Sequence, residues 1–241
     1  GYISDTFAGP IGRVADRYER WYFGGADAVV VPSETAADAV DAGETPVHVV
    51  SNGVDLDLFG PADPAAVETF RERPDLPEGP RVGYTGRQGH EKRLGEILAA
   101  TAELDIGVVI AGDGPSRPEL QRRAAARDDV RFLGFLDREA LPTFYTALDA
   151  FAFPSPVETQ GLVALESIAC GTPVVAADSG ALSETVTDGE TGTHFPCGDV
   201  DALRAAIRRT LADAHRLPTR PRERRRRLCV DRSVDDLEAV Y

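Results

Sequence analysis

Two glutamates lie where a short strand gives way to a helix. The apolar run 150–153 reads as a strand that ends at prolines, and Gly161 opens a segment with apolar residues at helical spacing. Glu158 lies in the loop between them, and Glu166 lies two turns into the helix. A bare pair of glutamates is weak evidence for a function, so the residues around it must show whether these carboxylates do chemistry.

Arg87 and Lys92 form a second pair, this time of cations. They lie five residues apart in a loop that follows the apolar run 81–85 and enters a helix. Two positive charges and the free amide groups of a helix start can hold a diphosphate. A solvated basic loop explains the same residues, but Lys92 is the only lysine among 26 lysines and arginines, which favours a binding role.

The pattern of apolar runs predicts the scaffold for these side chains. Residues 150–177 read as strand, loop, helix, turn and strand, a βαβ unit that binds ligands at the carboxyl ends of its strands. We predict further strands at 81–86, within 107–115 where the run ends in a glycine turn, and at 130–136, and helices at 116–126, 138–147 and 199–214. The fold class is therefore α/β, a doubly wound parallel sheet with helices on both faces.

The first 50 residues predict a smaller set of elements: a helix at 11–24, a buried strand within 26–33 and a short strand at 47–50. Ser33 can cap the helix that follows, with Ala36 at its third position. Asn52-Gly53 is a turn signal.

Three phrases resemble the retaining glycosyltransferases of family 4, which have the GT-B fold of two Rossmann-like domains. They are E-x-x-G-L-V-x-x-E with A-C-G-T-P-V-V-A in 158–176, G-R-x-x-x-x-K in 86–92 and N-G-V-D-x-x-x-F-x-P in 52–61. The resemblance covers nearly the whole chain but starts late in the first domain. It implies a remnant of the N-terminal acceptor domain with the linker at 1–57, a nucleotide-sugar-binding domain at 58–230, and a final helix at 231–241 that crosses back.

The resemblance also implies roles for particular residues. Glu158 would lie by the donor sugar, Glu166 would hold the ribose hydroxyls, and Arg87 and Lys92 would stabilise the departing diphosphate. Contacts of donor and nucleotide base would fall on a longer set, largely through backbone groups: Gly86, Gly114, Gly134, Phe135, Leu136, Gln160, Gly161, Leu162 and Val163. Core packing explains Phe135 equally well. Gln160 stands where the family usually has Phe, Arg93 where it often has Gly, and we expect Glu184 to be structural.

The implied function is transfer of a hexose from a nucleotide-diphosphate sugar to an acceptor, with retention at the anomeric carbon. Neither a metal nor another cofactor would be required. The phrase E-T-Q-G resembles some lipid glycosyltransferases, so a lipid-linked acceptor is one expectation for an otherwise unknown acceptor. A GT-B nucleotide-sugar epimerase, a sugar phosphorylase and a non-catalytic nucleotide-sugar-binding module are the alternatives. Because the chain begins with Gly1 and contains no methionine, we expect a fragment that is inactive alone.

The composition excludes some partners. A net charge of −14 argues against a nucleic-acid surface, and this acidic, lysine-poor composition suits either a halophilic source or a high-GC genome. No secretory signal opens the chain and three cysteines lack zinc spacing, so we expect a cytoplasmic protein. The basic run Arg220–Arg227 reads as a solvated helix face or as a contact with anionic lipid at the inner membrane face. No G-x-G-x-x-G, Ser-His-Asp or metal-binding signature is present.

Overall fold

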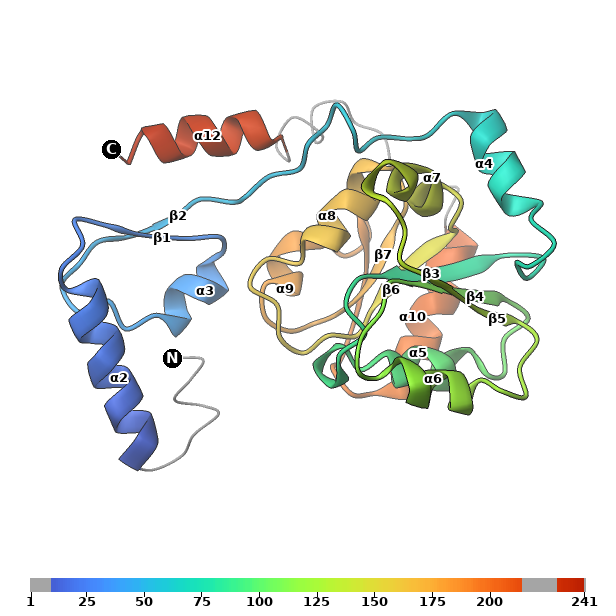
Figure 1. Cartoon of the computed structure of the whole chain (residues 1–241), viewed down its shortest axis with the longest axis horizontal. Coiled ribbons are helices and arrows are strands. Elements are labelled where there is room, and N and C mark those ends of the chain that lie inside the picture. The colour runs from blue at the N-terminus through green and yellow to red at the C-terminus, as the bar shows by residue number, and fades with distance from the viewer. Residues whose placement is uncertain (1–9, 214–228, 241) are drawn as a thin grey trace.

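A six-stranded, wholly parallel sheet forms the larger part of the molecule (Figure 1). The structure, a computed structural model, describes residues 10–213 and 229–240. The strand order is β5-β4-β3-β6-β7-β8, and the strands are β3 Arg81–Thr85, β4 Gly107–Ala111, β5 Val130–Gly134, β6 Ala150–Phe153, β7 Val174–Ala177 and β8 Gly192–Phe195. Every residue of β3, β4, β6 and β7 is buried, as expected of parallel strands covered on both faces.

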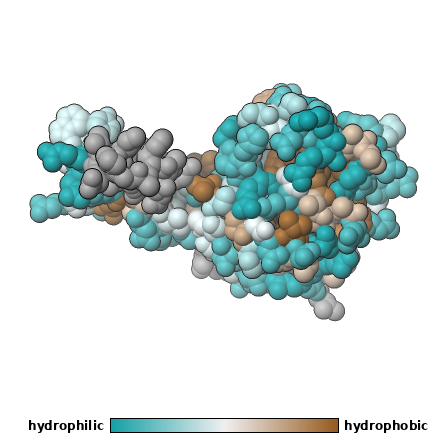
Figure 2. Space-filling view, turned by 90° about the horizontal axis from the view of Figure 1, so that it is seen from below, coloured by the Kyte–Doolittle hydropathy of each residue, from teal (hydrophilic) through white to brown (hydrophobic). Residues whose placement is uncertain are grey.

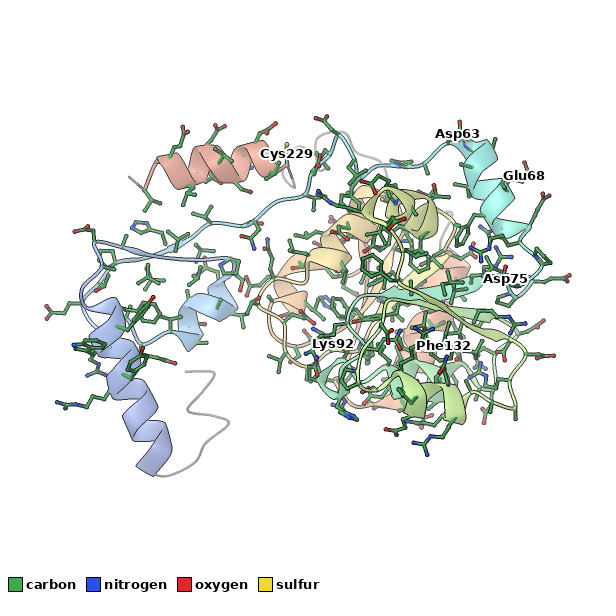
Figure 3. All side chains as sticks on the ribbon, in the orientation of Figure 1. Asp63, Glu68, Asp75, Lys92, Phe132 and Cys229 are labelled. Atoms are coloured by element: carbon green, nitrogen blue, oxygen red, sulfur yellow. The ribbon has the colours of Figure 1, made fainter. Side chains whose placement is uncertain are left out.

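Helices cover the two faces of this sheet. On one face lie α5 Leu94–Thr101, α6 Arg117–Arg123 and α10 Val200–Asp213, and on the other lie α4 Pro64–Arg71, α7 Leu141–Thr146, α8 Leu162–Ala169 and α9 Leu182–Thr185. The 3-10 helices η1 His90–Lys92 and η2 Arg138–Ala140 precede α5 and α7. Local chemistry sets several starts: Asp63 (Figure 3) accepts hydrogen bonds from the backbone N–H groups of Ala65 and Ala66, and Pro64 has no N–H to satisfy.

The strand order reverses between β3 and β6. The chain winds outward from β3 through β4 to β5, then crosses over to β6 and winds the other way, with Val82 paired to Ala150 and Gly83 to Phe151. Loops after two strands at such a switch point lead away in opposite directions, which leaves a crevice at the carboxyl ends of the strands. The loop after β3 carries Arg87 and Lys92, and the loop after β6 carries Glu158.

The N-terminal part is a smaller unit that projects from this body (Figure 2). It contains α2 Pro10–Phe23, β1 Val29–Val31, α3 Glu34–Ala39 and β2 Val47–Val49, and β1 pairs in parallel with β2. The Ser33 hydroxyl accepts a hydrogen bond from Ala36 N, which confirms the predicted cap. An extended segment leads from β2 to α4, and α12 Val230–Glu238 lies beside it, where Val230 N donates to Val54 O.

Two predictions about local structure need correction. The strand predicted within 26–33 is buried on one face only, because Val30 of β1 is 38% exposed on the uncovered face of a two-stranded sheet. The helix predicted at 138–147 is a 3-10 turn followed by α7, with Pro142 in the first turn of α7.

The basic run at 220–227 lies outside the described residues. Within the described part of the chain, none of the helices is both long and apolar enough to cross a membrane.

Gly112 and Gly79 offer a matched test of how closely the loops after β3 and β4 approach. Both have positive φ, 93° and 77°, but a Cβ on Gly112 would lie 2.1 Å from Gly86 O, whereas Gly79 has nothing within 4 Å. Gly79→Ala should lower the free energy of unfolding by about 1–2 kcal/mol, the cost of left-handed backbone alone. Gly112→Ala should lower it by at least about 2 kcal/mol more, because backbone must shift. Urea unfolding measures both, and equal losses would contradict the close approach.

Candidate functional site

Two adjoining pockets occupy the crevice between the loops after β3 and β6. One has a volume of about 320 Å³ and includes Lys92 and Glu158 in its walls, and the other has about 450 Å³ and includes Glu166. Thr85, Gly86, Arg87 and Val163 line both, so the pockets are two ends of one cleft. The structure therefore brings the two predicted glutamates and the two predicted cations to one place.

An ion pair joins the two loops. The Lys92 ammonium contacts a Glu158 carboxylate oxygen, and these side chains are only 18% and 13% exposed. Lys92 also lies over the Phe153 ring, 5.9 Å from its centre. A charge this far removed from water must be paired, and here each member of the pair compensates the charge of the other beside the carboxyl end of β6.

Free backbone amides lie beside this pair at the start of α8. Gly161 precedes the helix with φ of 75°, and no side chain caps it. An added Cβ at Gly161 would lie 2.7 Å from Leu182 Cδ2, so both its backbone angle and the packing require glycine. The first amides of a helix have no partner within the helix, and those of Leu162 and Val163 belong to residues that line the cleft. The helix start therefore adds positive potential beside Lys92.

Glu166 stands in the other end of the cleft. Its Oε2 accepts a hydrogen bond of 2.7 Å from the Tyr145 hydroxyl. Burial raises the pKa of Glu166 above its ordinary value, while this hydrogen bond acts in the opposite direction and lowers it. Burial also raises the pKa of Tyr145, so the phenol stays a donor. One carboxylate oxygen is thus occupied by Tyr145, and the other can accept hydrogen bonds from a ligand.

Arg87 is the most exposed of the four charged residues. Its side chain is 62% exposed and pairs with Glu91 four residues on. Its carbonyl accepts a hydrogen bond of 3.1 Å from the Tyr84 hydroxyl. Burial raises the pKa of Tyr84, and the nearby Glu158 carboxylate raises it further. Tyr84 therefore fixes the turn after β3 as a neutral donor.

The Gln160 side chain is committed to the linker, whereas the expected contact of its backbone N–H with the donor stays a prediction. Its side chain is buried and bridges to the linker, since Oε1 accepts from Asn52 Nδ2 at 2.6 Å and Nε2 donates to Ser51 Oγ at 2.5 Å. The residue lines the cleft, but its amide is committed to residues 51–52. Asn52 itself lines the same pocket, and nothing in the local sequence pattern predicts this pairing across 108 residues.

The structure divides Gly134, Phe135 and Leu136, expected at the nucleotide base, and Gly114, expected at the donor, into two groups. Phe135 and Leu136 line the Glu166 end, and Phe135 is 82% exposed, so the core-packing alternative is wrong. Gly134 and Gly114 are absent from the lining of this pocket. A Cβ on Gly114 would lie 2.6 Å from Gln88 O, which places this glycine where two loops touch. Sequence reasoning missed Tyr145, which donates to Glu166, and Arg138, which lines the same pocket. Only the crossover through η2 and α7 brings these two residues to Glu166.

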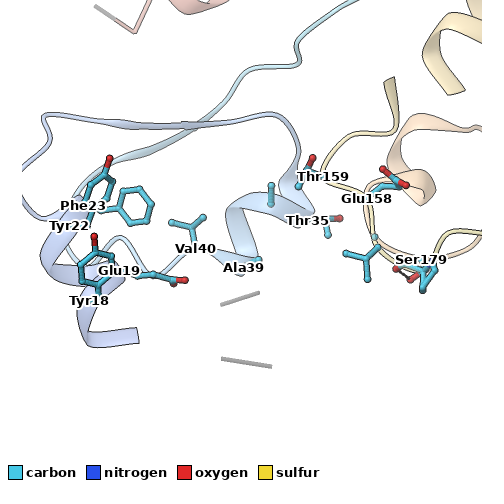
Figure 4. Close-up of a pocket in the computed structure, with 14 residues that line it drawn as sticks. Tyr18, Glu19, Tyr22, Phe23, Thr35, Ala39, Val40, Glu158, Thr159 and Ser179 are labelled. Atoms are coloured by element: carbon cyan, nitrogen blue, oxygen red, sulfur yellow. Dashed lines mark hydrogen bonds between the residues drawn. The ribbon is translucent and has the colours of Figure 1, made fainter. Parts of the chain in front are cut away.

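A third pocket, of about 570 Å³, opens on the other side of Glu158 (Figure 4). Glu158 and Thr159 form one wall, and apolar and aromatic side chains of α2 and α3 form the opposite one. Within the described residues no three His, Cys, Asp or Glu side chains gather closely enough to hold a metal ion. Besides Arg87, Lys92, Glu158 and Glu166, the charged side chains of Asp113 and Arg138 line the Glu166 end of the cleft.

Comparison with known proteins identifies the family. A family model described as "Glycosyl transferases group 1" matches residues 67–228, more than half of the chain, and another described as "Glycosyltransferase Family 4" matches residues 2–58. The chain belongs to the group 1 glycosyl transferases. A D-inositol 3-phosphate glycosyltransferase of Salinispora tropica is 40% identical over 245 residues, which cover 90% of this chain and 51% of that protein. The 2-deoxystreptamine glucosyltransferase of Streptomyces kanamyceticus is 34% identical over 81% of this chain and 54% of its own length.

This glycosyl transferase chain thus spans about half the length of the curated relatives it matches. Among solved structures, Anabaena HepE in complex with UDP superposes with a TM-score of 0.79 at 23% identity, over 89% of this chain and 63% of that one. Sucrose-phosphate synthase from Thermosynechococcus elongatus gives 0.77 at 27% identity, over 100% and 61%. These likenesses confirm the predicted Rossmann-like fold of the GT-B class.

The Lys92–Glu158 pair predicts a specific pattern of stability. Lys92→Met should lower the free energy of unfolding by about 2–4 kcal/mol, because it leaves the Glu158 carboxylate buried without a partner. Adding Glu158→Leu should recover most of this loss, since both charges are then gone. Arg209→Met breaks a pair whose members are each 51% exposed, and it should cost less than about 1 kcal/mol. Urea unfolding measures all three, and a double variant no more stable than Lys92→Met would refute the pairing argument.

Proposed function

We propose that this chain forms the donor side of a retaining glycosyltransferase of the family 4 type, which moves a hexose from a nucleotide-diphosphate sugar to an acceptor. One observation carries the proposal: Lys92 and Glu158 lie beside the uncapped start of α8, and Glu166 lies in the adjoining pocket. The cleft offers cations and amides at one end and a carboxylate at the other, which suits a diphosphate flanked by a sugar and a ribose.

The proposed chemistry follows from the charges that develop. When the bond between the anomeric carbon and the diphosphate breaks, negative charge gathers on the diphosphate and positive charge on the sugar. Lys92, Arg87 and the amides at Leu162 and Val163 would stabilise the leaving diphosphate. The carboxylate of Glu158 would orient the sugar and stabilise its positive charge. Fixed cations and a helix dipole occupy the place where a divalent metal would otherwise act, so we propose that none is required.

The remaining contacts would hold the nucleotide. Glu166 would accept hydrogen bonds from the ribose hydroxyls through the oxygen that Tyr145 leaves free. Phe135 and Leu136 would pack against the base. The acceptor would approach from the N-terminal side, where the third pocket meets Glu158. A lipid-linked acceptor, with Arg220–Arg227 at an anionic membrane surface, stays a prediction because that segment lies outside the described residues.

A screen of nucleotide sugars tests the reaction type. A protein that contains this chain and spans the length of the curated relatives should transfer a hexose. Its product should have the anomeric configuration of the donor, which NMR determines. The present chain alone should not, because orienting an acceptor contributes about 7–11 kcal/mol to such a reaction. An epimerised sugar without transfer to an acceptor would favour a nucleotide-sugar epimerase. Release of a sugar phosphate that requires inorganic phosphate would favour a sugar phosphorylase. Tight binding without turnover would favour a binding module.

The pH dependence of UDP binding tests Glu166. Its pKa is raised above 4.5 by burial, so its carboxylate protonates, and stops accepting as strongly, at a higher pH than an ordinary glutamate. Calorimetry should show UDP affinity falling as the pH drops through this raised pKa. Tyr145→Phe removes the hydrogen bond that lowers the pKa, so the fall should move to higher pH.

Glu166→Gln serves as the control for this titration, because it removes the Glu166 carboxylate and leaves the phosphate groups of UDP and the other residues of the cleft unchanged. At neutral pH, Glu166→Ala should weaken UDP binding by about 1.5–3 kcal/mol. A pH profile identical in Glu166→Gln and the parent protein would remove Glu166 from the binding site.

A further inference from the structure

Three consecutive carbonyl groups fix the loop that carries Glu158. Ala181 N donates to Glu158 O at 3.3 Å, and Thr185 Oγ1 donates to Gln160 O at 2.7 Å. Both donors come from α9 or the residue before it, within the larger body. The carbonyl between them, that of Thr159, accepts instead from the Ser33 hydroxyl at 2.7 Å. Ser33 belongs to the N-terminal part, so this loop is complete only when the two parts of the molecule meet.

A second contact holds the same two parts together a few residues away. Glu184 of α9 accepts from the backbone N–H groups of Glu34 at 3.0 Å and Thr35 at 2.7 Å, and from the Thr35 hydroxyl. These are the first amides of α3, which have no partner inside the helix. A carboxylate at a helix start is favoured by both hydrogen bonding and the helix dipole. Figure 4 shows Thr35 beside Glu158 and Thr159.

Ser33 connects the two contacts. Its hydroxyl accepts from Ala36 N at 3.0 Å while it donates to Thr159 O, and the residue is 5% exposed. The path is therefore closed: α9 holds α3 through Glu184, α3 holds Ser33, and Ser33 and α9 together hold residues 158–160. The Lys92–Glu158 pair lies at the end of this path.

We propose that Glu184 and Ser33 form a latch between the two parts, and that the latch positions the Glu158 loop for the reaction. This inference rests on the proposed function for its catalytic consequence. Neither residue touches the donor cleft, because Glu184 and Ser33 lie outside the linings of both its pockets. They are positioning residues, and they should affect turnover without affecting nucleotide binding.

Hydrogen exchange on this chain tests the latch without any activity. Glu184→Ala should speed exchange of the amides at 34–36 about five- to tenfold, the loss expected when a helix start is left uncapped. Glu184→Gln keeps one acceptor oxygen, so its exchange rate should lie between those of the parent protein and Glu184→Ala. Glu68→Ala is the control, because Glu68 is exposed on α4 (Figure 3) and takes no part in the contacts made by Ser33 and Glu184. Unchanged exchange in Glu184→Ala would overturn the latch.

Kinetics of the full-length enzyme test the positioning role. Glu184→Ala and Ser33→Ala should lower kcat between about tenfold and a hundredfold, because the Glu158 loop is misplaced. The Kd of UDP should stay within about twofold of the parent in both, as it should in Glu68→Ala. Ser33→Thr keeps the hydroxyl and should restore kcat. Faster exchange with an unchanged kcat would make Glu184 a helix cap only and refute the proposal. If the parent transfers no sugar, the proposed function fails, and the exchange result alone decides whether the latch exists.

Discussion

The ion pair between Lys92 and Glu158 constrains the rest of the site. Two charges that are less than a fifth exposed must stay together, because either one alone would face a desolvation cost of several kcal/mol. Their loops follow β3 and β6, and these strands are neighbours only because the strand order reverses between them. The reversal thus places a lysine against a carboxylate at the sheet edge, and the uncapped start of α8 lies at the same point. A ligand that brings negative charge here meets groups already fixed by the fold.

Close backbone contact keeps the lysine loop in place. Gln88 is fully buried, its N–H donates to Asp113 O at 2.8 Å, and its side chain donates to Gly112 O at 2.9 Å. In return, Gln88 O accepts from Ser116 N at 2.9 Å. This close contact requires glycine at positions 112 and 114, since a side chain on either would collide with the backbone of the loop after β3. Gly112 and Asp113 of this motif line the cleft, and Gly114 packs against the backbone of Gln88 in the loop that carries Arg87 and Lys92. The expected contact of Gly114 with the donor stays a prediction.

The elements of the larger body were predictable because each carries its own local signal. Buried parallel strands read as unbroken apolar runs, and glycines mark the turns, so β3 to β7 fall close to their predicted positions. Pairings across the fold carry no such signal. Glu166 and Tyr145 are 21 residues apart, Gln160 and Asn52 are 108 apart, and Lys92 and Glu158 are 66 apart. Local periodicity places each residue on an element, but only the topology decides which elements meet, and so the partners of the site residues had to come from the structure.

The charge of the whole chain then limits how such a site can bind. With a net charge of −14, the protein as a whole repels a diphosphate. At physiological ionic strength this repulsion extends over a Debye length of about 8–10 Å. Long-range attraction therefore cannot supply the affinity, and binding has to rest on contacts at hydrogen-bond distance. At molar salt the Debye length is about 3 Å, so the repulsion disappears while contacts of that length survive. A site built from one largely buried lysine and backbone amides would therefore bind a diphosphate in both dilute and molar salt. A cluster of exposed surface arginines would bind it only in dilute salt.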